Sequence, residues 1–123
     1  MWAPVVAYMA MLFVFSSFST LPSLPGDVSY EQVHVAAYAG LAAVTLRALA
    51  EGRWRQVTVA VACGAVLMSS AYGATDEYHQ RFVPGRDSSR IDLLADAIGS
   101  TVGAGGLWAW SIIRRRSKTS DVL

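Results

Sequence analysis

Apolar residues occur in four long runs along the chain, and short polar or turn-forming segments separate them. The runs cover about residues 4–18, 33–50, 57–74 and 91–113, and the breaks are LPSLPGD, EGRWRQ and a polar stretch that begins at Thr75. A helix needs roughly 20 mostly apolar residues to cross a bilayer. The pattern predicts an all-α fold: one domain over 1–123, a four-helix transmembrane bundle with helices at about 4–20, 33–50, 57–80 and 89–113.

The composition favours a membrane protein. With 54% hydrophobic residues in 123, the chain has few polar residues with which to cover a water-exposed surface. Ten basic and nine acidic residues give a net charge of +1, so no overall field would attract DNA or RNA, and no nucleic-acid partner is expected. Cys63 is the only cysteine, which excludes an intrachain disulfide, and we expect it to be a small buried packing residue.

Basic residues indicate how the bundle is oriented, because lysine and arginine near helix ends stay on the cytoplasmic side. Seven flank the second connection or follow the last helix, whereas three lie near the third connection. We therefore expect a multi-pass protein of the cell membrane with both termini cytoplasmic. The seven are Arg47, Arg53, Arg55, Arg114, Arg115, Arg116 and Lys118, and the three are Arg81, Arg86 and Arg90.

Two further features concern the membrane boundary. The four tryptophans lie near the ends of the apolar runs, where indole rings prefer the headgroup region, so we interpret them as anchors. The first run is short, and a cleaved signal peptide is an alternative for it, although no basic residues precede it. The tryptophans are Trp2, Trp54, Trp108 and Trp110.

The polar stretch from Thr75 to Asp96 holds most of the groups that could do chemistry. Carboxylates, histidine and arginine are costly inside a membrane and usually mark a working site. If the third helix continues past Ala74, residues three and four apart share a face, so Asp76 lies with His79 and Gln80. Glu77 would share a second face with Arg81. The structural alternatives are a solvated helix end and a surface ion pair, which contributes little in water.

The stretch continues into the last helix, after a chain reversal predicted at Pro84 and Gly85. Ser89 and Asp92 match a capping box, which gives Asp92 a structural alternative. Asp96 lies one turn deeper among apolar residues, and a carboxylate facing lipid would cost several kcal/mol, so we expect it to point into the bundle towards a partner.

Small residues continue the same face. Asp92, Asp96, Gly99 and Gly103 form one stripe, and the glycines permit close helix contact either within one chain or in a homo-oligomer. On the second helix, His34 and Tyr38 are four residues apart and are expected to meet this stripe. Taken alone, such a histidine is more often a satisfied structural group.

Taken together, these residues resemble the pattern of the VanZ-like family of small bacterial membrane proteins, over the second to fourth helices. The family has a histidine followed by an aromatic residue, then a polar group around the third connection, then an acid and a glycine in the last helix. The matching residues are His34 and Tyr38; Asp76, Glu77, Gln80, Phe82, Pro84, Gly85 and Arg86; and Asp92 and Gly99.

The chain departs from the family pattern at two places. Tyr30 and Glu31 stand where an Asp-Lys pair is usual, and Asp96 stands where an asparagine is usual. The resemblance implies a general role in the cell envelope and an association with antibiotic resistance, namely low-level resistance to the glycopeptide teicoplanin. It does not imply a particular reaction.

Our first functional hypothesis is a polar site at the outer leaflet that binds or modifies an anionic envelope lipid or a lipid-linked cell-wall intermediate. As an enzyme it would be a hydrolase or a transferase, in which buried carboxyl groups or an imidazole move protons and an arginine holds a phosphate. The candidate catalytic residues are His34, Asp76, Glu77, Asp92 and Asp96, and the candidate substrate-binding residues are Tyr38, His79, Gln80 and Arg86.

Other hypotheses remain open from the residues alone. Asp, Glu and His are suitable ligands for a divalent metal, but the chain has no HExxH motif and no paired cysteines, so the sequence leaves the cofactor undecided. The alternative function is non-catalytic: the protein binds an envelope component or assists a partner, and the charges form a structural network. Transport would need a homo-oligomer to supply a pathway.

Overall fold

The computed structural model describes residues 2–17, 30–84 and 90–122, except for the side chains of residues 16, 30, 31, 54, 92 and 115–122. This described part is all-helical and has no strand, which confirms the predicted all-α fold. It contains four α-helices, α1 (Ala3–Ser16), α2 (Tyr30–Leu49), α3 (Val59–Gln80) and α4 (Arg90–Val122), and one 3-10 helix, η1 (Trp54–Gln56).

Local signals explain several helix ends. Pro4 lies in the first turn of α1, where its missing N–H removes no helical hydrogen bond. Thr58 caps α3, since its hydroxyl accepts a hydrogen bond from the backbone N–H of Val61 at 3.2 Å. α4 continues beyond the expected end at residue 113, because arginine, lysine and serine interrupt the apolar run without interrupting a helix.

A Schellman turn ends α2. The backbone N–H of Glu51 donates to the carbonyl of Ala48 at 3.1 Å, and that of Gly52 donates to the carbonyl of Arg47 at 2.9 Å. Glu51 and Gly52 have φ values of 53° and 71°, a left-handed conformation that glycine adopts without steric cost. The turn folds Gly52 and the following residue, Arg53, back towards Arg47.

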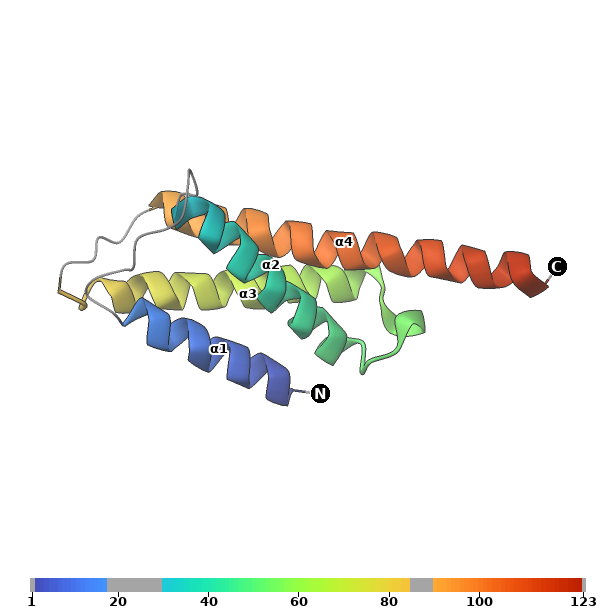
Figure 1. Ribbon diagram of the computed structural model, residues 1–123, viewed down its shortest axis with the longest axis horizontal. Helices are drawn as coiled ribbons and strands as arrows, with labels where there is room; N and C mark the ends of the chain where they lie inside the picture. Colours follow the sequence, from blue (N-terminus) through green and yellow to red (C-terminus); the bar gives the residue numbers. More distant parts are fainter. Residues whose placement is uncertain (1, 18–29, 85–89, 123) are drawn as a thin grey trace.

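The helices run in alternating directions (Figure 1). α3 and α4 lie along the long axis, α2 crosses them obliquely and contacts both, and α1 packs on α2 and α3. One end of the bundle, which we call the Gln80 end, holds the end of α1, the start of α2, the end of α3 and the start of α4. The opposite end, which we call the Arg47 end, holds the start of α1, the end of α2, η1 and the start of α3.

Glycines allow α2 and α4 to approach closely. A Cβ atom at Gly99 would overlap the carbonyl oxygen of Val35, and one at Gly103 would overlap that of Ala39. No side chain separates the two backbones at these points. The glycine stripe expected from the sequence therefore serves contact between two helices of the same chain.

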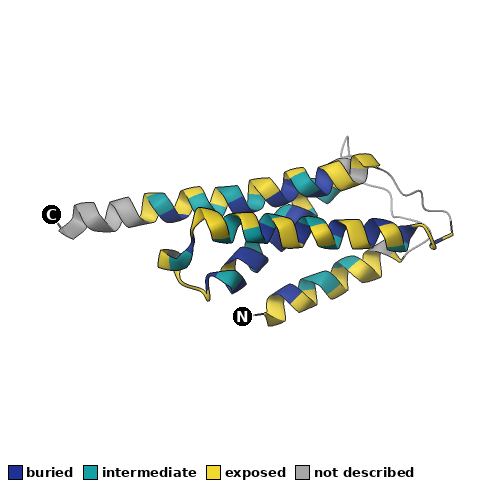
Figure 2. Cartoon of the chain, turned by 180° about the vertical axis from the view of Figure 1, so that it is seen from behind, coloured by how far each residue is buried: buried dark blue, intermediate teal, exposed yellow. Residues whose placement is uncertain are grey.

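The interior combines apolar core clusters with buried polar side chains, and Figure 2 shows buried and exposed positions alternating along the helices. Among the described side chains, the fully buried ones include Gln80 and Asp96, with exposed fractions of 1% and 0%, as well as three serines and Thr45. Leu67 on α3 and Phe82 just after it are 70% and 71% exposed. The described chain therefore has a largely apolar exterior around an interior that contains polar groups.

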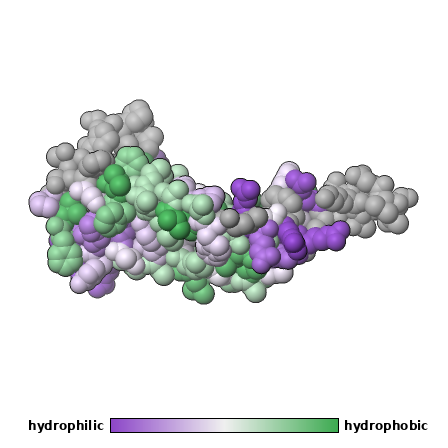
Figure 3. Space-filling model, turned by 90° about the horizontal axis from the view of Figure 1, so that it is seen from below, coloured by the Kyte–Doolittle hydropathy of each residue, from purple (hydrophilic) through white to green (hydrophobic). Residues whose placement is uncertain are grey.

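The outward faces also correct one expectation. Cys63 is a free and exposed cysteine on α3, so the prediction of a buried packing residue is wrong. Its segment of α3 supplies apolar residues to the exterior of the bundle as well as to its core, to which Ala65 belongs. Figure 3 shows hydrophobic side chains over the middle of one face and hydrophilic ones gathered beside the later part of α4.

Candidate functional site

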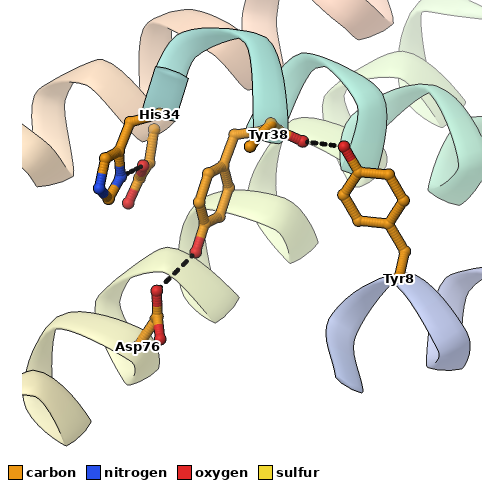
Figure 4. Close-up of polar contacts among 6 residues, drawn as sticks. Tyr8, His34, Tyr38 and Asp76 are labelled. Atoms are coloured by element: carbon orange, nitrogen blue, oxygen red, sulfur yellow. Dashed lines mark hydrogen bonds and ion pairs between the residues drawn. The ribbon is translucent and has the colours of Figure 1, made fainter. Parts of the chain in front are cut away.

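A histidine–aspartate pair joins α2 and α4 near the Gln80 end. The Nδ1 atom of His34 lies 2.7 Å from Oδ1 of Asp96 (Figure 4). Asp96 is fully buried and His34 is partly buried. The carboxylate would stabilise positive charge on the imidazole, so the pair can take up and return a proton.

A tyrosine–aspartate contact joins α2 and α3 beside this pair. The hydroxyl of Tyr38 points towards Asp76 and donates to its Oδ2 at 3.4 Å, a long hydrogen bond (Figure 4). The rings of His34 and Tyr38 are parallel, with centroids 6.3 Å apart, as their spacing of one helical turn predicts. The structure thus brings together two residues from α2 and one acid from each of α3 and α4.

Further polar residues line the inner face of α3. Glu77 and Gln80 are buried with Asp76, so α3 turns these three polar side chains inwards near this end. Arg81 is exposed, and its guanidinium lies 6.0 Å from the ring centroid of Tyr78. Because Glu77 is buried, a surface ion pair with Arg81 does not describe its environment.

A glycine makes room for the buried acid. A Cβ atom at Gly73 would lie 2.8 Å from Oδ2 of Asp96, closer than van der Waals contact allows. Gly73 lies three residues before Asp76 on α3, which places it on the inner face of that helix. The carboxylate of Asp96 therefore occupies space that any larger residue at position 73 would take.

Buried hydroxyl groups extend the polar interior towards the Arg47 end. Ser69 lies one turn from Gly73 on α3, and Ser100 lies one turn from Asp96 on α4, and both are fully buried. Within the described residues, their Oγ atoms, Oδ2 of Asp96 and Oε1 of Gln80 have no hydrogen-bond partner. Buried polar atoms usually have a partner, so these atoms offer hydrogen-bonding capacity to a bound molecule or to water.

His79 was predicted to bind substrate on the same helix face as Asp76, but its side chain contacts other residues. Its Nε2 lies 3.1 Å from the hydroxyl oxygen of Ser17, and its ring stacks on Phe13 at a centroid distance of 4.5 Å. These contacts turn His79 towards the end of the first helix. The described residues therefore do not place it with His34 and Asp96.

Two tyrosines hold α1 against the rest of the bundle. The hydroxyl of Tyr8 donates to the carbonyl of Ala37 at 2.7 Å (Figure 4), and that of Tyr72 donates to the carbonyl of Met9 at 2.6 Å. The ring of Tyr72 also lies 6.5 Å from that of Tyr38. Through Tyr72, α1 is in contact with the residues that surround the site.

Some predicted site residues lie outside the description. Arg86 and Ser89 are not among the described residues, and neither is the side chain of Asp92. The roles proposed for Arg86 and Asp92, and the predicted capping box, stay predictions. Among the described residues, no group of three or more His, Cys, Asp or Glu side chains could hold a metal ion.

Sequence reasoning did not single out Ser69, Gly73, Tyr72 or Ser100. A signal for the α3 residues was present, because Ser69, Gly73, Asp76 and Gln80 follow the spacing of one helix face. Small and hydroxyl-bearing residues within an apolar run are common in packed membrane helices, so this spacing does not by itself indicate a site.

Comparisons with known proteins add no relative: no family model, no curated protein and no solved structure matches this chain. The resemblance to the VanZ-like family therefore depends on the matching residues and their spacing.

Proposed function

We propose that this protein is a membrane protein of the bacterial cell envelope whose interior polar site binds or modifies a lipid or a lipid-linked cell-wall intermediate. One observation carries the proposal. Three helices with largely apolar exteriors enclose a His34–Asp96 pair together with Asp76, Glu77 and Gln80. Such a costly arrangement usually serves a function.

The apolar exterior supports placement in a bilayer. By length and composition, α3 is the one described helix that could cross a membrane, and the apolar helix at Ala3–Phe15 is shorter. The polar residues that α2 and α4 turn inwards lower the mean hydropathy of these helices while leaving apolar side chains such as Ile98 and Val102 outside. Four spans with the Gln80 end outward therefore remain our proposal for the topology.

A charge on the exterior of α3 tests this placement. In a membrane, Leu67→Asp replaces an apolar side chain by a carboxylate against lipid and is expected to cost about 3 to 4 kcal/mol of insertion free energy. On a water-exposed surface the same change would cost about 0.5 kcal/mol or less. The measurement is the amount of protein that stays with membranes after an alkaline carbonate wash.

Gln56→Asp is the matched control, because Gln56 lies in η1 outside α3. We expect Leu67→Asp to reduce the membrane-bound amount strongly and Gln56→Asp to leave it unchanged. Equal recovery of both variants in the membrane fraction, or a fully soluble wild type, would contradict the membrane placement.

The described residues favour a headgroup that donates hydrogen bonds. Carboxylates accept hydrogen bonds and do not donate them when ionised, and Oε1 of Gln80 is a further acceptor. Hydroxyl groups of a glycerol or sugar headgroup fit these acceptors. Binding of an anionic group would depend on a cation such as Arg86, which can contact phosphate through two parallel hydrogen bonds.

If the site is catalytic, its described residues fit proton transfer in hydrolysis or group transfer. His34 would take the proton from a hydroxyl or water nucleophile, and Asp96 would stabilise the charged imidazole that results. Asp76 and Tyr38 would position the group that reacts.

Profiling of lipids and cell-wall precursors tests the function. Cells without the protein are compared with cells that carry the wild type or the double variant His34→Phe/Asp96→Leu, which removes the pair without leaving a buried charge. We expect a lipid or precursor to accumulate in both the deletion and the variant, and teicoplanin tolerance to fall with it if this member contributes to resistance. An unchanged profile in the deletion would oppose the catalytic proposal.

A second candidate is a non-catalytic protein in which the polar groups hold the helices together. The contacts of His34 with Asp96 and of Tyr38 with Asp76 favour it, because each joins α2 to another helix. This hypothesis predicts that the double variant, if present at normal amount, retains function. Loss of function at normal amount would favour the site.

A further inference from the structure

We propose a second binding site, at the Arg47 end, for an anionic phospholipid whose acyl chain enters an apolar cavity and whose phosphate binds Arg47 and Arg53. The cavity has a volume of about 440 Å³. Binding sites for small ligands commonly have volumes of about 300–1,000 Å³. The proposal does not depend on the polar site at the Gln80 end.

The wall of the cavity is apolar and well anchored. Leu46, Ala50 and Val57 contribute to it and belong to a buried core cluster, and Leu107 of α4 packs against that cluster. Buried packing of this kind preserves the shape of the wall. The interior of the cavity therefore suits a hydrocarbon chain better than a polar molecule.

Two arginines also line the cavity. Arg47 and Arg53 are both exposed, so their aliphatic parts can cover apolar wall while their guanidinium groups remain at the opening. The Schellman turn brings them together, because the N–H of Gly52 donates to the carbonyl of Arg47 and the chain continues directly into Arg53. Gly52 itself lines the cavity.

The charge at the opening indicates what occupies it. Within the described part of the chain, neither Arg47 nor Arg53 forms an ion pair with an acidic side chain. Guanidinium groups bind phosphate through paired, charge-assisted hydrogen bonds. An apolar wall with two such groups at its mouth complements a molecule that has a hydrocarbon chain and a phosphate at one end.

Native mass spectrometry of the detergent-solubilised full chain tests the site, with phosphatidylglycerol, phosphatidylcholine and glycerol 3-phosphate as probes. The variant is Arg47→Gln/Arg53→Gln, and the control is Arg55→Gln, an exposed arginine of η1 that does not line the cavity. We expect the wild type and the control to retain phosphatidylglycerol. The amount of phosphatidylglycerol that the double variant retains should be at least about tenfold lower. This is the effect expected from the loss of one charge-assisted hydrogen bond.

The other probes separate the sources of affinity. Phosphatidylcholine should bind more weakly than phosphatidylglycerol, since its choline group places a positive charge near the arginines, and glycerol 3-phosphate should bind weakly because it lacks an acyl chain. Binding of glycerol 3-phosphate as tight as that of phosphatidylglycerol would overturn the role of the cavity. If the Arg55→Gln control lost as much phosphatidylglycerol as the double variant, binding would depend on general surface charge, and the proposal would also be overturned.

A third variant tests the cavity while keeping both arginines. Ala43 lines the cavity, and Ala43→Phe should fill part of it and reduce phosphatidylglycerol retention without changing helix content. Unchanged retention in this variant would contradict entry of the acyl chain. A dimer of the wild type that the arginine variant dissociates would assign the cavity to a second copy of the chain and would likewise overturn the proposal.

Discussion

The double variant Gly99→Ala/Gly103→Ala is expected to lose more than about 4 kcal/mol of stability, because each new Cβ atom would overlap a backbone carbonyl of α2. A flexible side chain could move away from a new methyl group, whereas a helix backbone cannot move alone. The two changes would force α2 and α4 apart along their closest contact. Each single variant should lose about half as much.

The chain offers a matched control for this experiment. Gly105 and Gly106 lie on the same helix, and a Cβ atom at either would meet no other atom within 4 Å. Gly105→Ala and Gly106→Ala should therefore stabilise the protein by about 0.5–1 kcal/mol each, because alanine favours the helix over glycine.

The measurement is the free energy of unfolding of the purified protein in detergent, followed by the loss of helical circular dichroism. A separation of several kcal/mol between the two pairs of variants would support the contact between α2 and α4. Similar values for the two pairs would mean that α2 and α4 do not touch through these glycines.

Separating His34 from Asp96 is the second change with a large expected effect. His34→Phe keeps a planar ring next to Tyr38 but removes the partner of a fully buried carboxylate. A buried charge that loses its partner typically costs about 3–5 kcal/mol. We therefore expect this single variant to be strongly destabilised.

Removing both partners should recover most of the stability that the single variant loses. Leucine has nearly the branched shape of aspartate, and replacement of a buried ion pair by apolar groups of similar volume is often neutral. The free energy of unfolding of His34→Phe/Asp96→Leu is therefore expected to lie within about 1.5 kcal/mol of that of the wild type. This recovery makes the double variant suitable for the functional comparison proposed above.

Asp96→Asn completes the series. Its side-chain oxygen can still accept a hydrogen bond from Nδ1 of His34, so we expect a loss of about 1 kcal/mol or less. Unfolding of His34→Phe, Asp96→Leu and the double variant in detergent measures the coupling between the two residues. If the losses from these two single variants simply add in the double variant, the pair is not coupled in the detergent-solubilised protein.

Much of the fold could be predicted from the chain alone. The breaks at EGRWRQ and after Thr75 separate runs of helical length, so the presence of the helices and the end of α3 at Gln80 followed from hydrophobicity and turn residues, whereas α1 ends at Ser16 and not at the expected residue 20. The end of α4 did not, because basic residues stop an apolar run without stopping a helix. The hydropathy of a segment predicts the surroundings of a helix better than it predicts where the helix ends.

The candidate site was less accessible to sequence reasoning. Spacing places His34 with Tyr38 on one helix face, but it does not say whether that face points towards α3 and α4. The same spacing grouped His79 with Asp76, although His79 contacts Ser17 and Phe13 in the structure. Its neighbours depend on where α1 packs, and no local pattern contains that information.

The sequence by itself determined that the chain is helical, where its apolar runs begin and end, and which residue types could do chemistry, because these properties depend on local composition and periodicity. Only the tertiary structure decided that Asp96 meets His34, that Glu77 turns inwards and that Cys63 turns outwards. Those outcomes depend on the rotation and depth of each helix against its neighbours. Contacts such as that of Gly99 with Val35 set this arrangement across distant parts of the chain.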